Sequence, residues 1–155
     1  MDTLREQLIK ALNGGQAFVP FKEAIEGIKP ENRTLKANKN THSIWQEFEH
    51  IRIAQEDILQ YMLDPDWKSP KWPDEFWPKE SKELSEKAWK NTYDGFFKDL
   101  DTVVKLVKNP EIDLLEIIPH TKSHTYLREI LLIIEHNAYH IGKLVDIRKS
   151  LNNWG

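Results

Sequence analysis

The stretch LREILLIIEHNAYHIGKLVDIRKSL, residues 127–151, decides the fold class of this chain. Its apolar residues recur three and four positions apart around much of the helical circumference, which predicts a long, well-buried helix. Thr121 or Ser123 is expected to cap its first turn. A helix that is apolar on so many sides needs other helices to cover it, so the stretch indicates an all-α bundle.

Three further segments show helical periodicity, and none shows the alternation of a strand. Ser43 and Gln46 have the spacing of a capping box and open the second helix. Pro110 marks the end of the third helix, since a proline disfavours helical backbone at the residue before it. We therefore predict a bundle of four main helices, over residues 3–12, 43–63, 81–108 and 126–151.

The connections between these helices differ in composition. Residues 18–28 have room for a short helical piece, whereas residues 28–42 are polar and aperiodic, which predicts a linker. Residues 64–80 (DPDWKSPKWPDEFWPKE) interleave prolines with tryptophans, and the prolines exclude a helix. Because an indole buries a large apolar surface when it packs, we expect this Trp/Pro-rich loop to lie across the bundle.

Composition limits the classes of function. The formal net charge is −3, from 22 Lys and Arg against 25 Asp and Glu, so nucleic acid is not an expected partner. Cysteine is absent, which excludes disulfides, thiolate metal sites and cysteine nucleophiles. No apolar run approaches the roughly 20 residues of a membrane-spanning helix, and no signal peptide is recognisable. We expect one cytoplasmic domain over residues 1–155, with no membrane partner.

His136 and His140 are the most informative polar residues. They stand four positions apart on the apolar side of the predicted C-terminal helix, so both are expected to point inward. Two imidazoles at this spacing bind one ion when a third ligand arrives from elsewhere, and His50 on the helix 43–63 can supply it. Three such ligands leave positions open for water or substrate. The alternative is that these are ordinary core histidines and that no metal binds.

Two other metal motifs fit the same residues poorly. A metalloprotease helix reads HExxH, but Asn137 follows His136 where the catalytic glutamate would stand. A di-iron site needs Glu-x-x-His on two helices. Glu47 and His50 have that spacing, whereas Ile133 and Asn137 stand three residues before His136 and His140, where the second glutamate would be needed. The pattern therefore favours a single divalent transition metal.

The three remaining histidines are not expected to bind the ion. His120 and His124 are also four residues apart, but the residues between them (Thr121, Lys122, Ser123) indicate a loop or a cap, so we expect exposed or rim positions. His42 precedes the cap of the second helix and is predicted to face solvent.

The chain resembles the DinB/YfiT-like superfamily of four-helix-bundle proteins with a three-histidine metal site. The resemblance runs nearly end to end and is carried by REQLIKALNGGQAFVPF, HSIWQEFEHIRIAQEDILQYM, SPKWPDEFWP and residues 127–151. It implies that His50, His136 and His140 hold the ion, that the ion is zinc or nickel, and that the protein is a homodimer. Lys143 and Phe18 depart from the pattern, since relatives often carry Gln at the first position and a polar residue or His at the second.

The resemblance leaves three functions open. The first is a thiol S-transferase, in which a metal-activated thiolate from a small thiol attacks an electrophile. The second is a metal-dependent hydrolase that uses a metal-bound water. The third is a non-catalytic, stress-associated metal-binding bundle protein. Hydrolysis also needs a proton shuttle, for which the candidates by placement are Glu47, Asp57, Tyr61 and Tyr139.

Overall fold

The structure is a computed structural model that describes residues 2–154. Within that range the chain is all-helical, and its only β-type pairings are two isolated bridges. The all-α prediction is therefore confirmed. The elements are α1 (Thr3–Asn13), α2 (Phe21–Ile25), the 3-10 turn η1 (Pro30–Asn32), α3 (Ile44–Leu63), α4 (Glu86–Lys108) and α5 (Tyr126–Ser150).

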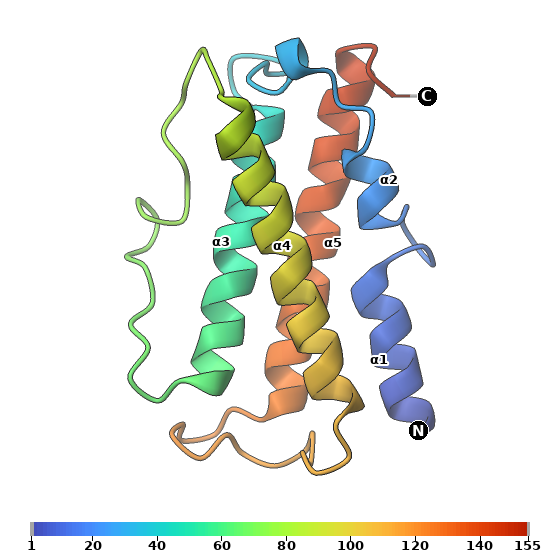
Figure 1. The fold of residues 1–155 in the computed structure, drawn as a ribbon, viewed down its shortest axis with the longest axis vertical. Helices are drawn as coiled ribbons and strands as arrows, with labels where there is room; N and C mark the ends of the chain where they lie inside the picture. The colour runs from blue at the N-terminus through green and yellow to red at the C-terminus, as the bar shows by residue number, and fades with distance from the viewer. Residues whose placement is uncertain (1, 155) are drawn as a thin grey trace.

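Figure 1 shows the long helices α3, α4 and α5 side by side, with α1 and α2 following one another along the remaining side. α3 contacts both α4 and α5, and α1 contacts the same two helices, so the apolar core lies between them. α3 and α4 run in the same direction, whereas α1 and α5 run in the opposite one (Figure 1). Because α3 and α4 are parallel, the chain must travel back along the bundle between them. Residues 64–85 make that return.

Helix boundaries set by local capping signals agree with the prediction. The Ser43 hydroxyl accepts from the Gln46 backbone, and the Gln46 side chain accepts from the Ser43 backbone, which is the predicted capping box. α1 ends at Asn13, and Gly14 and Gly15 follow with positive φ angles of 72° and 85°. Glycine adopts such angles without steric strain, so the chain can turn there.

One predicted helix start and one predicted cap are wrong, whereas α5 begins at Tyr126 as predicted. α4 begins at Glu86 with Ser85 as its cap, and not at residue 81. α5 is capped by Thr125, whose hydroxyl accepts from the Arg128 backbone, and not by Thr121 or Ser123. The Thr121 hydroxyl is occupied in the preceding turn, where it donates to backbone carbonyls. A serine or threonine that precedes a helix therefore caps it only where its own backbone is extended and does not belong to the preceding turn.

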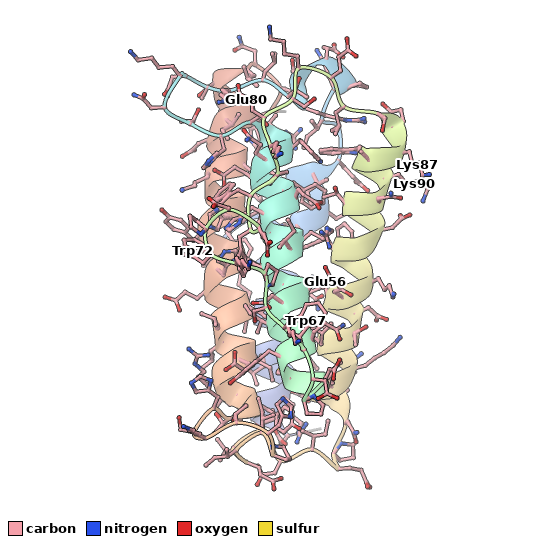
Figure 2. The ribbon with its side chains drawn as sticks, turned by 90° about the vertical axis from the view of Figure 1, so that its left-hand side faces the viewer. Glu56, Trp67, Trp72, Glu80, Lys87 and Lys90 are labelled. Atoms are coloured by element: carbon pink, nitrogen blue, oxygen red, sulfur yellow. The ribbon has the colours of Figure 1, made fainter. Side chains whose placement is uncertain are left out.

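The Trp/Pro-rich loop does lie against the bundle, and Figure 2 shows it running back along the outside of α3. The Trp67 indole N–H donates to the Asp57 carboxylate of α3 at 2.8 Å. Trp72 differs, because 71% of it is exposed. The loop is therefore attached at some of its tryptophans only.

A buried polar connection links the three long helices near their middle. The Gln55 amide of α3 donates to the Phe96 carbonyl of α4 and accepts from the Asn137 amide of α5, both at 2.8 Å. Gln55 and Asn137 are essentially inaccessible to solvent. Buried hydrogen bonds of this kind hold helices in one register, because sliding would leave the amides unpaired.

None of the helices in residues 2–154 has the length and apolar character needed to cross a membrane.

Candidate metal centre

Three histidines from two helices meet in the bundle. α3 contributes His50, and α5 contributes His136 and His140 one turn apart. The Nε2 atom of His50 lies 3.2 Å from Nε2 of His140 and 3.1 Å from Nε2 of His136. His50 and His140 are buried and His136 is half-buried. The predicted inward orientation is correct, and the three predicted ligands lie together.

The far nitrogen of His50 and of His140 is engaged by an acceptor. His50 Nδ1 lies 2.8 Å from the Phe76 carbonyl oxygen, and His140 Nδ1 lies 2.7 Å from Oε2 of Glu47. Burial alone would raise the pKa of the Glu47 carboxyl, but its hydrogen bond and charge interaction with His140 outweigh burial and lower the pKa. A carbonyl and a carboxylate can only accept, so each Nδ1 must carry the proton. The Nε2 atom of each ring is therefore the nitrogen left to face the cluster.

The Nε2 atoms of His50 and His140 lie 3.2 Å apart, so a proton or a metal ion must lie between or beside them. Burial lowers the pKa of His50 and of His136 to about 4, and the neighbouring imidazole of His140 adds to the shift. His50 and His136 are therefore uncharged at neutral pH, and the cluster of facing nitrogens could hold a metal ion.

The spacing also matches the size of such an ion. Zinc binds imidazole nitrogen at about 2.0–2.1 Å, which places two ligands about 3.3–3.4 Å apart in a tetrahedron and about 2.8–3.0 Å apart in an octahedron. The observed separations of 3.1 and 3.2 Å fall between these values. His136 Nδ1, which is buried, finds no hydrogen-bond partner in the described part of the chain. The ligand nitrogens of all three histidines lie within 4.8 Å of one another, so together they could hold one ion.

Trp77 of the Trp/Pro-rich loop covers one side of the cluster. Its ring stacks on His50 at 3.8 Å with an interplanar angle of 5°, and its other face stacks on His42 at 3.8 Å. His42 in turn places Nδ1 3.3 Å from Oε1 of Glu47. His42, which was predicted to face solvent, has a side chain that is 43% exposed, and its covered part lies in this stack. The stacking of Trp77 on His50 and the contact of the Phe76 carbonyl with His50 are not predicted by the sequence pattern.

The proposed proton-shuttle candidates separate into two groups. Glu47 contacts His140 directly, and the Tyr139 ring meets His140 edge-on at 4.9 Å while remaining 62% exposed. Asp57 bonds instead to Trp67, seven residues or about 10 Å along α3 from His50.

Tyr61 belongs to a separate contact near the far end of α3. Its hydroxyl lies 3.0 Å from Nδ1 of His124, and its carbonyl accepts from Nε2 of His120 at 2.7 Å. His120 is exposed and His124 is half-buried, and neither joins the three-histidine cluster. Both lie where the loop prediction put them.

Within residues 2–154, His50, His136 and His140 are the only group of three His, Asp or Glu residues whose ligand atoms all lie within 4.8 Å of one another. Three neutral imidazoles leave a bound divalent ion its full charge and at least one open position. Comparison of the chain with protein-family models, curated proteins and solved structures gives no match.

Proposed function

We propose that the protein binds one zinc or nickel ion through His50, His136 and His140, as the resemblance to the DinB/YfiT-like four-helix bundles implies. The observation that supports this most strongly is the approach of His50 Nε2 to the Nε2 atoms of His140 and His136, at 3.2 and 3.1 Å. Imidazole ligands suit several divalent transition metals, so both ions are compatible with the site. The hydrogen bonds from Nδ1 to Glu47 and to Phe76 orient the rings, as carboxylate and carbonyl partners do in metal sites generally.

We further propose that the site transfers a small thiol to an electrophile. A bound divalent ion lowers the pKa of a thiol and so supplies a thiolate at neutral pH. The thiol proton leaves to solvent, the sulfur forms a bond to the electrophilic carbon, and the leaving group departs with its bonding pair. His50, His136 and His140 would hold the centre, and Trp77 would exclude water from the His50 side.

The position of Glu47 favours thiol transfer over hydrolysis. A hydrolase needs a base beside the water on the Nε2 side of the ligands. Glu47 contacts His140 through Nδ1, on the opposite edge of the ring, and its second oxygen faces His42. It is therefore placed to orient a ligand and not to accept a proton from water. Thiol transfer needs no such base, because the sulfur is the nucleophile once ionised.

Cobalt substitution tests this proposal directly. The protein is loaded with Co(II), and its absorption spectrum is recorded with cysteine or bacillithiol and with a hydroxyl analogue such as serine as the control. A thiolate-to-cobalt charge-transfer band that saturates with the thiol alone is expected, followed by metal-dependent consumption of an added alkylating electrophile. A cobalt spectrum that no thiol changes would contradict the transferase and leave a structural ion. The dimer expected from the resemblance is checked by light scattering on the same sample.

A further inference from the structure

Arg148, near the end of α5, is a buried cation outside the three-histidine cluster. Only 4% of the residue is exposed. Its Nε donates to the Asn153 carbonyl at 2.8 Å, and its Nη1 donates to the carbonyls of Glu23 and Ala24 at 3.1 and 2.7 Å. These bonds tie α2 and the segment after α5 to the bundle. They engage two of the three guanidinium nitrogens.

The guanidinium has no counterion in the part of the chain that the structure describes. Arg33 and Arg52 are also largely buried, but each pairs with a carboxylate at 2.7 Å. No Asp or Glu oxygen among residues 2–154 lies within 4.0 Å of Arg148, and burial lowers its pKa with no acidic neighbour to oppose the shift. A buried charge without an opposite charge is costly, because carbonyl dipoles replace only part of its hydration.

The remaining nitrogen, Nη2, faces a cavity of about 640 Å³ between α2 and α5. It makes no hydrogen bond to any described residue. Gly27 adjoins it, and a side-chain carbon at this glycine would stand 3.6 Å from Nη2. The absence of a side chain at Gly27 leaves Nη2 open to the cavity.

The walls of the cavity combine apolar rings with charged side chains. Pro20 and Trp154 line it, and the Trp154 ring centroid lies 4.9 Å from Arg148 Cζ. Glu23, Glu26 and Lys22 also line it, and the Lys22 ammonium is 3.5 Å from Glu26. The two acidic groups of the lining disfavour a dianion such as phosphate more than a single carboxylate. The rings supply an apolar surface beside the charged floor.

We propose that this cavity binds a small organic carboxylate carried on an apolar group, with Arg148 Nη2 as its donor. The carboxylate forms a charge-assisted hydrogen bond with Nη2, and the apolar group packs against Trp154 and Pro20. None of the three histidines lines this cavity. The site is therefore separate from the proposed metal centre, and the two proposals stand or fall independently.

The test uses 3-phenylpropionate, phenethylamine and inorganic phosphate with the wild-type protein, measured by calorimetry and by the NMR signals of the tryptophan indoles. Saturable binding of 3-phenylpropionate that shifts one indole signal is expected, with no binding of the amine or of phosphate. Failure of 3-phenylpropionate to bind would overturn the proposal. Equal binding of phosphate would overturn the assignment to a carboxylate.

Variants locate the binding. Arg148→Gln should weaken 3-phenylpropionate binding at least about tenfold, because the charge-assisted bond is lost. Because Arg148 also binds backbone carbonyls of α2, its replacement can disturb the fold. Glu23→Gln changes an exposed side chain and leaves the hydrogen bond from Arg148 to the Glu23 carbonyl in place. Removing this like charge should tighten binding by about two- to fivefold, whereas the matched change Glu111→Gln at the other end of the molecule should not. Equal affinities in the Glu23 and Glu111 variants would place the ligand elsewhere and contradict the proposal.

Discussion

Replacing Glu47 by Gln is expected to weaken zinc binding by about 10- to 100-fold, which corresponds to about 1.4–2.7 kcal/mol. The magnitude follows from the contact that is lost. The Glu47 carboxylate lies 2.7 Å from His140 Nδ1, and the two side chains are 3% and 7% exposed. The amide keeps the size of the side chain but removes the charge that makes His140 a stronger donor to the ion.

A competition titration against a chromophoric chelator at pH 7 measures this effect. Glu56→Gln is the matched control, since it makes the same chemical change on α3 at a residue that pairs with Arg52 and lies outside the cluster. Thermal unfolding of the metal-free variants checks that both remain folded. Zinc affinity of Glu47→Gln within twofold of wild type would refute the role given to Glu47. An equal loss in both variants would show that the effect is not local.

Two further outcomes follow from the geometry. The folded-state pKa values of His50 and His136, about 4, lie below the ordinary value of 6.5, so the unfolded chain takes up protons first. The metal-free protein should therefore lose up to about 1.4 kcal/mol of unfolding free energy per pH unit for each histidine as the pH falls from about 6.5 to 4. A urea midpoint that stays constant over this pH range would contradict this prediction. Trp77→Ala should lower the unfolding free energy by about 1–3 kcal/mol, because it removes the stacking on His50. Trp72→Ala should change the unfolding free energy by less than about 0.5 kcal/mol, because Trp72 is 71% exposed. Urea unfolding of the two metal-free variants measures both values, and equal losses would count against a specific role for Trp77.

The parts of the fold that depend on local signals could be predicted from the sequence. The start of α3 is defined by a capping box whose two residues, Ser43 and Gln46, are only three positions apart in the sequence. The start of α4 depended on a distant contact, because Ser81 and Ser85 are both chemically able to cap a helix. The Thr34 hydroxyl donates to the Lys82 carbonyl and helps hold the segment before Ser85 outside the helix.

The candidate site divides in the same way. The spacing of His136 and His140 on an apolar helix face is a local property, and it correctly placed both beside His50. Trp77 and His42 reach the cluster through segments without periodicity, whose paths depend on tertiary packing. The helical period carries no information about such segments. Their part in the site could be seen only once the loop was placed against α3.

Metal content is the most direct test of the central claim. Untagged protein reconstituted with zinc or nickel is dialysed and measured by elemental mass spectrometry, beside His50→Ala, His136→Ala and His140→Ala. His124→Ala is the control, since this histidine lies with Tyr61 outside the cluster. About one ion per chain is expected in the wild type and the control, and close to none in the three other variants. A wild-type protein without metal, or an ion retained by all three variants, would contradict the three-histidine centre.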